Sequence, residues 1–213
     1  MRQYGATVED VDWCRTDIKA CIGWLEQQGY SRVALVGHSL GGVKGIYYQH
    51  RAADPRVVAV VSLSAPRLSY AYLSESESGE EFLSYYEQAD SLVKDRRPGT
   101  LMDVKFPVDH IFSAANYIGK MGPKEKYDIM ALADGLHVPL LALGGSRERR
   151  AHIRDVAAPL VEAATNSPQR EAHVIEGANH FYRDKLEETS EVILRWLAQL
   201  QLPPADESAL EDA

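Results

Sequence analysis

Residues 33–42, which read VALVGHSLGG, constrain the fold of this 213-residue chain more than any other stretch. A short apolar run leads into GHSLG at residues 37–41, and a helical pattern follows. The pattern G-x-S-x-G between a strand and a helix is typical of a nucleophile elbow, a sharp and strained turn that presents the serine hydroxyl. Glycines at positions 37 and 41 keep side chains out of the turn. The sequence therefore predicts that Ser39 is a nucleophile at the edge of a β-sheet.

The chain on both sides of this turn alternates between helical and strand patterns. The expected strands are 32–37, 57–63, 138–143 and 173–175. The expected helices are 7–28, with Thr7 as N-cap, then 41–50, 151–165 and 184–200. Continuous apolar strands that alternate with helices are typical of a parallel sheet covered on both faces. The predicted fold class is therefore α/β, with a mostly parallel sheet.

The connection between the second and third of these strands is too long for a simple crossover. We expect residues 67–135 to form an inserted helical cap over the carboxyl ends of the strands, between core segments 1–66 and 136–202. Its aromatic residues either line a pocket or form the cap's own small core, and the second is favoured. These residues are Tyr70, Tyr72, Tyr85, Tyr86 and Phe112. Residues 203–213 are expected to be a disordered acidic tail.

A serine nucleophile requires a general base, and the base requires an acid that orients it. His180 is the predicted base because it follows the last short strand, at the sheet edge where Ser39 emerges. His38 is expected to pack behind Ser39. The remaining histidines include His110, which lies in the cap and can line the pocket. His152 and His173 are expected at the surface.

The predicted acid follows the third strand, where aspartate is usual but the residues at 144–148 are GGSRE. Glu148 is the nearest carboxylate, and its extra methylene lets it reach the same imidazole nitrogen. Two alternatives stay open: Glu148 is a solvated charge beside neighbouring arginines, or Asp155 in the following helix is the acid. The backbone N–H of Leu40, directly after the nucleophile, is the predicted oxyanion donor.

These pieces resemble the α/β-hydrolase superfamily. The matching motifs are GHSLGG at 37–42, VPLL at 138–141 with its glycine turn, and GANHF at 177–181. Their order of serine, acid and histidine is that of the superfamily, and the resemblance covers residues 7–200. It implies a serine hydrolase that cleaves a carboxylic ester or a related small-molecule acyl substrate through an acyl-enzyme. Serine at the elbow disfavours dehalogenase and dienelactone chemistry, for which this fold uses aspartate and cysteine.

The resemblance is incomplete ahead of the elbow. Members of the superfamily carry several strands there, and a loop among them, commonly His-Gly, supplies a second oxyanion amide. Here one predicted helix precedes the elbow strand, so the sequence looks N-terminally truncated. An alternative function is therefore a catalytically impaired domain that binds or self-associates through an exposed sheet edge. A thioesterase or peptidase with the same triad is a further alternative.

The composition argues against several other classes of protein. The formal net charge is −8 and there is no basic run, so no nucleic-acid partner is expected. No apolar run approaches the roughly 20 residues of a membrane span, and no apolar leader follows Met1, so a cytoplasmic protein without a membrane partner is expected. No metal cluster or phosphate loop is evident, so no cofactor is expected. Cys14 and Cys21 are predicted to be buried thiols, about 10 Å apart on one helix and too distant for a disulfide.

Overall fold

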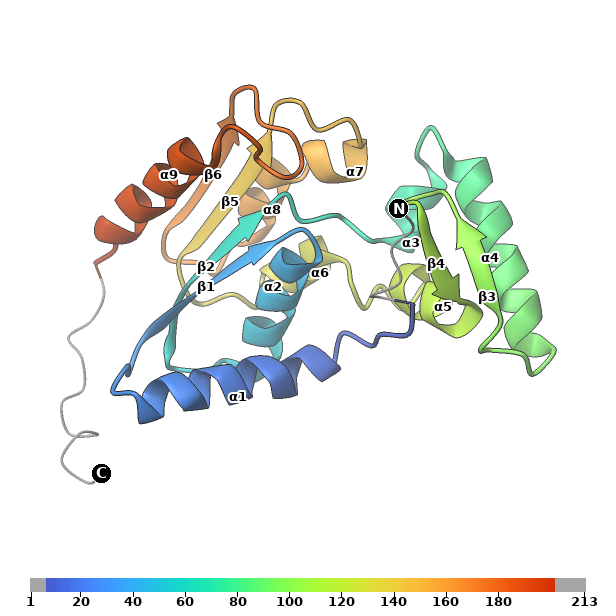
Figure 1. The fold of residues 1–213 in the computed structure, drawn as a ribbon, viewed down its shortest axis with the longest axis horizontal. Coiled ribbons are helices and arrows are strands. Elements are labelled where there is room, and N and C mark those ends of the chain that lie inside the picture. Colours follow the sequence, from blue (N-terminus) through green and yellow to red (C-terminus); the bar gives the residue numbers. More distant parts are fainter. Residues whose placement is uncertain (1–6, 202–213) are drawn as a thin grey trace.

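A computed structural model describes residues 7–201. Its centre is a four-stranded sheet in the order β1-β2-β5-β6, with every neighbouring pair parallel. The strands are β1 (Val33–His38), β2 (Val57–Leu63), β5 (Leu140–Gly145) and β6 (Arg170–Ile175). The predicted α/β class and the mostly parallel sheet are confirmed (Figure 1).

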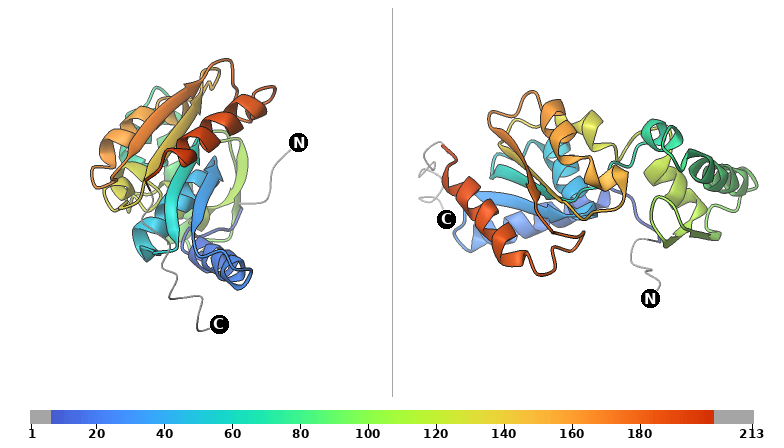
Figure 2. Two further views of the ribbon diagram at one scale, coloured as in Figure 1. Left: turned by 90° about the vertical axis from the view of Figure 1, so that its left-hand side faces the viewer. Right: turned by 90° about the horizontal axis from the view of Figure 1, so that it is seen from above.

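Helices cover both faces of this sheet, as Figure 2 shows. On one face, Val60, Leu140 and Ala142 join the larger apolar core, and helices α2, α6 and α8 pack there. On the other face, Val61 and Leu143 pack with residues of α9 in a smaller core. The helices of the core are α1 (Trp13–Gln27), α2 (Leu40–Ala52), α6 (Ile129–Ala133), α7 (Ala151–Arg154), α8 (Ala157–Ala163) and α9 (Leu186–Ala198).

The excursion between β2 and β5 stands beside the sheet in Figure 1. Its elements are α3 (Tyr70–Ser74), α4 (Gly79–Lys94), β3 (Leu101–Val104), β4 (His110–Ser113) and α5 (Ala114–Met121). The excursion is not helical throughout, because β3 and β4 pair as an antiparallel hairpin where a cap of helices was expected. The last helix before β5, α6, packs against α2 and α8 and is therefore counted with the core.

The aromatic residues of the excursion pack mainly against one another. Tyr70 contacts Phe82 and Tyr86 edge-on, with ring centroids 5.7 and 4.9 Å away. Tyr117 contacts Phe82, Tyr85 and Phe112. The favoured interpretation, a small aromatic core within this insertion, agrees with these contacts.

The first helix begins later than predicted, at Trp13 with Asp12 as its N-cap, so the prediction of Thr7 as the cap is wrong. Residues 7–12 instead link the core to the insertion. The carboxylate of Glu9 binds Lys44 of α2 and also Lys120 of α5, at 2.7 Å from the Lys120 Nζ. The Glu9 carboxylate therefore pairs with two distant lysines rather than with the N-terminus of α1.

Exposure departs from the sequence prediction near the start of the sheet. Within residues 7–201, β1 has a strand neighbour on one side only, so Val36 is 55% exposed although its apolar run suggested a buried strand. On α1, Cys14 is buried as predicted, but Cys21 is exposed. The helix predicted over 151–165 is divided into α7 and α8.

Two further points concern the ends of the chain and its helices. The predicted disordered tail at 203–213 lies outside the described residues. No helix in the described part of the chain is sufficiently long and apolar to span a bilayer.

Candidate active site

Ser39 lies in the turn between β1 and α2, with φ 55° and ψ −125°. Positive φ is uncommon for a residue with a side chain and indicates a strained backbone. The Ser39 N–H donates to the backbone oxygen of Leu63 at the end of β2, with a donor–acceptor distance of 2.8 Å. This bond anchors the turn to the neighbouring strand.

Two glycines make this turn possible by their lack of a side chain. A Cβ on Gly37 would lie 2.3 Å from the backbone oxygen of Gly41, and a Cβ on Gly42 would lie 2.6 Å from the Ser62 hydroxyl oxygen. A Cβ on Gly41 would meet no atom of the described residues within 4 Å. The steric role predicted for Gly41 is therefore wrong, since Gly42 is the second residue with no room for a side chain.

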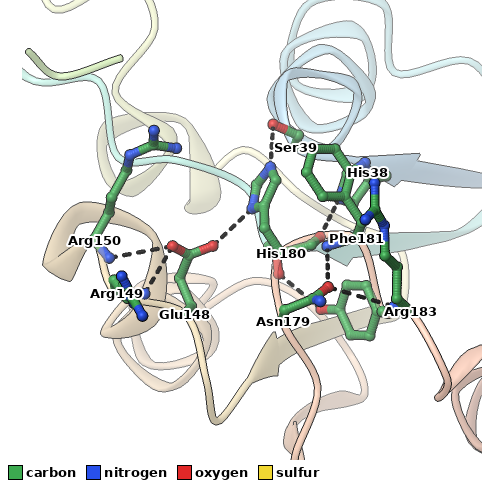
Figure 3. A network of polar contacts seen from close by, with 11 residues as sticks. His38, Ser39, Glu148, Arg149, Arg150, Asn179, His180, Phe181 and Arg183 are labelled. Atoms are coloured by element: carbon green, nitrogen blue, oxygen red, sulfur yellow. Dashed lines mark hydrogen bonds and ion pairs between the residues drawn. The ribbon is translucent and has the colours of Figure 1, made fainter. Parts of the chain in front are cut away.

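The structure brings Ser39, His180 and Glu148 into one hydrogen-bonded chain (Figure 3). The Nε2 atom of His180 lies 3.1 Å from the Ser39 Oγ, and its Nδ1 lies 2.8 Å from Glu148 Oε2. The three residues follow β1, β6 and β5, whose carboxyl ends meet at the same edge of the parallel sheet. Because a carboxylate only accepts hydrogen bonds, Nδ1 carries the proton and Nε2 of the neutral ring accepts from the serine.

Glu148 is a buried carboxylate, with its side chain only 5% exposed. Its second oxygen, Oε1, accepts the backbone N–H groups of Arg149 and Arg150 at 2.9 and 3.2 Å. Glu148 is therefore not a solvated charge. Asp155 forms two hydrogen bonds with the side chain of Arg154, each 2.7 Å long, and makes no hydrogen bond to His180.

The surroundings of His180 favour its neutral form. Burial lowers its pKa, the charge of Glu148 acts in the opposite direction, and the electrostatic effects of the neighbouring His38 and Arg150 lower it further. The net pKa lies below the ordinary histidine value of 6.5. A neutral imidazole at pH 7 is the form that can accept a proton.

The loop that carries His180 is held at two further points that the sequence analysis missed. The Nε2–H of His38 donates to the backbone oxygen of His180 at 2.7 Å, so His38 does more than pack behind Ser39. The Tyr182 hydroxyl lies 2.8 Å from the Ser64 Oγ, and both of these residues have positive φ. No sequence motif marks Ser64 or Tyr182, which meet because the loops after β2 and β6 come together at the carboxyl edge of the sheet, past the intervening β5.

A cavity of about 590 Å³ opens on Ser39 and His180 and is lined by residues of both the core and the insertion. His110 lines it, as the sequence analysis allowed. His152 also lines it, so the prediction of a surface position is wrong; the side chain packs against the ring of Phe106. Burial lowers the pKa of His152 to about 4.

Two further observations concern the chemistry of the site. Leu40 is the first residue of α2, and the N–H groups at the start of a helix have no partner within it. The Leu40 N–H is thus free of helical bonds directly beside Ser39.

Among residues 7–201, no three His, Cys, Asp or Glu side chains gather in a way that could hold a metal ion.

Comparisons with solved structures show how the fold is related to others. The monoacylglycerol lipase of Paleococcus ferrophilus matches with a TM-score of 0.62 and 20% identity over 89% of this chain and 75% of the lipase chain. Est1E of Butyrivibrio proteoclasticus matches with a TM-score of 0.60 and 14% identity over 90% of this chain and 71% of the Est1E chain. An alpha/beta hydrolase from the sediment metagenome of the Mar Chica lagoon, Morocco, matches with a TM-score of 0.56 and 15% identity. The match covers 92% of this chain and 76% of the chain of that enzyme.

At the level of sequence, no protein-family model matches the chain, and a comparison with curated proteins finds no match either. The likeness is therefore one of three-dimensional structure. The chain has the α/β-hydrolase fold.

Proposed function

We propose that the protein is a serine hydrolase that cleaves carboxylic esters of small acyl compounds. The observation that carries the proposal is the hydrogen-bonded chain from Ser39 Oγ through His180 to the buried Glu148 carboxylate. A serine without such a base is a weak nucleophile. The name of one structural neighbour, a monoacylglycerol lipase, supports an ester as substrate.

The proposed reaction has two halves. Ser39 Oγ attacks the ester carbonyl carbon while its proton passes to His180 Nε2, and the Leu40 N–H binds the negative oxygen of the tetrahedral intermediate. The ester C–O bond then breaks, and the alcohol leaves with the proton from His180. Water attacks the acyl-enzyme, His180 takes the proton of that water and returns it to Ser39, and the carboxylic acid is released. Glu148 stabilises the imidazolium in both halves.

Labelling with a fluorophosphonate probe tests this proposal. We expect the unaltered protein to be labelled and Ser39→Ala protein to remain unlabelled. Ser146→Ala is the matched control, because Ser146 is exposed, binds Glu176 and does not line the cavity. Labelling that does not depend on Ser39, or no labelling at all, would contradict the enzyme proposal and favour a binding role. A panel of oxygen esters, thioesters and peptides distinguishes an esterase from a thioesterase or peptidase.

A further inference from the structure

We propose that the cavity selects esters that also carry a carboxylate, and that the guanidinium of Arg150 binds this anionic group. The proposal rests on the proposed function, because it assumes that the acyl compound is cleaved at Ser39. It adds a substrate class and a specificity-determining residue outside the hydrogen-bonded chain of Ser39, His180 and Glu148.

The charges that line the cavity leave one cation uncompensated. The permanent cations of the lining are Lys105, Lys120 and Arg150. Lys105 pairs with Asp103 and Asp109, at 3.1 and 2.9 Å.

Lys120 is buried and pairs with Glu9 at 2.7 Å. Arg150, by contrast, has no carboxylate partner for its guanidinium among residues 7–201. A protein with a net charge of −8 therefore presents an unpaired positive charge at this cavity. Guanidinium groups bind carboxylates with two parallel hydrogen bonds, which makes an anionic ligand the natural partner.

The position of Arg150 is fixed by the same contact that holds Glu148. Its backbone N–H donates to Glu148 Oε1 at 3.2 Å, while Figure 3 shows its side chain running away from that carboxylate. The guanidinium is near enough to the reaction centre for its charge to lower the pKa of both His180 and His152, in addition to the larger effect of burial. Because Ser39, His180 and Arg150 all line this cavity, a group bound by Arg150 would lie in the same cavity as the ester carbonyl.

Other residues of the cavity suit the rest of such a substrate. Much of the lining is apolar, including Leu68, Val108, Phe112 and Met121, and suits a hydrocarbon segment between the ester and the anion. His110 is 7% exposed, and its buried Nε2 has no hydrogen-bond partner among the described residues. Since an unpaired buried polar atom is costly, a polar atom of the ligand is a suitable partner for it.

Matched pairs of esters test the proposal. Each pair contains the monomethyl ester of succinic, glutaric or adipic acid, which is anionic, and the corresponding neutral dimethyl ester, with kcat/KM measured by methanol release. We expect the protein to prefer the anionic member of at least one pair. Arg150→Gln should reduce the ratio of kcat/KM for the anionic ester to kcat/KM for the neutral ester by about 10- to 100-fold. This is the usual effect of losing a hydrogen bond to a charged group. Arg150→Lys should retain part of the preference.

Arg147→Gln is the matched control. It removes one positive charge from the same loop, but Arg147 does not line the cavity, so the ratio should stay within about twofold of that of the unaltered protein. A preference for the neutral ester in every pair, or a ratio unchanged by Arg150→Gln, would overturn the proposal. Ser39-dependent cleavage of the dimethyl esters would then leave the proposed function intact.

A binding measurement separates the two proposals further. Monomethyl adipate should bind to Ser39→Ala protein in a calorimetric titration, and Arg150→Gln in that background should weaken the binding by about 10-fold or more. Absence of binding by all three monomethyl esters would overturn the anion site. The fluorophosphonate result would decide on the hydrolase itself.

Discussion

The Nε2 atom of His38 lies 2.7 Å from the backbone oxygen of His180. The residue directly before the proposed nucleophile thus holds the main chain of the proposed base, across 142 positions of sequence. The rings of the two histidines also contact each other, with centroids 4.8 Å apart. Substitution of His38 should therefore disturb the alignment of His180 with Ser39 without removing either group.

His38→Ala should lower kcat for a neutral ester by about 3- to 10-fold, the usual effect of losing one neutral hydrogen bond. His38→Gln, whose amide N–H can donate to the same oxygen, should recover part of the loss. Steady-state kinetics of the two variants check this prediction. Equal losses in both variants would indicate that the ring contact matters rather than the hydrogen bond.

Glu148→Gln should lower kcat by about 10²- to 10⁴-fold, because an amide no longer stabilises the imidazolium or selects the correct tautomer of His180. Asp155→Asn is the matched control and should be nearly neutral for kcat, since among residues 7–201 the Asp155 carboxylate binds only Arg154. Turnover close to normal in Glu148→Gln protein would exclude Glu148 as the orienting acid.

The pH dependence of kcat/KM should show an acidic limb with an apparent pKa below 6.5, since burial lowers the pKa of His180. Activity requires the neutral imidazole, so kcat/KM should rise as the pH rises through this value and then level off. Removing the negative charge in Glu148→Gln should move the limb to lower pH, because that charge raises the pKa of His180. A limb that moves to higher pH would contradict the assignment.

Gly42→Ala should lower the free energy of unfolding by about 1–3 kcal/mol, because the added Cβ would overlap the Ser62 hydroxyl and the Ala65 Cβ. Gly41→Ala lies one position earlier in the same helix, where the space is open. It should be neutral or stabilising by up to about 1 kcal/mol, through helix propensity. Urea unfolding of both proteins measures the difference. Equal effects would show that the close approach at Gly42 has little energetic weight.

Asp54 should make the stability of the protein depend on pH in the acidic range. Its carboxylate accepts hydrogen bonds from Arg56 and from the Tyr48 hydroxyl, and the Arg56 side chain above all lowers its pKa to about 2. Because this pKa is lower than the ordinary value of 3.8, the contribution to stability is complete above about pH 4 and is lost as the pH falls toward 2.

Asp54→Asn should therefore reduce the free energy of unfolding at pH 7 by about 1–3 kcal/mol, the usual cost of removing one partner of a buried charged hydrogen bond. The difference between the two proteins should shrink between pH 4 and pH 2. Denaturant unfolding at several pH values checks this, and a difference that is independent of pH would contradict it.

Much of the fold follows from local sequence patterns. The strand predicted at 57–63 has those bounds in the structure, and the other three strands agree within a few residues. Apolar runs bounded by glycine, proline and charged residues determine these elements because each run must be buried wherever it lies. Strand β1 is the exception, because part of its apolar run is exposed to solvent. How many strands pair with it is not determined by its own sequence.

The insertion shows where sequence patterns fail. The hairpin of β3 and β4 was not predicted, because its four-residue strands carry too weak a pattern and depend on pairing with each other. The late start of α1 has a similar cause: Glu9 and Asp10 resemble first-turn residues, but they bind lysines from distant elements.

The sequence by itself determined the elbow, since GHSLG between a strand and a helix already implies the strained backbone of Ser39. It also indicated His180 and Glu148 through their places after successive strands. Only the tertiary structure decided between Glu148 and Asp155 as the partner of His180, because the Glu148 carboxylate is held toward His180 by backbone N–H groups whereas the Asp155 carboxylate pairs with Arg154. It alone shows that the Arg150 guanidinium has no carboxylate partner within the described residues 7–201, since charge compensation in a cavity depends on residues brought together from distant parts of the chain.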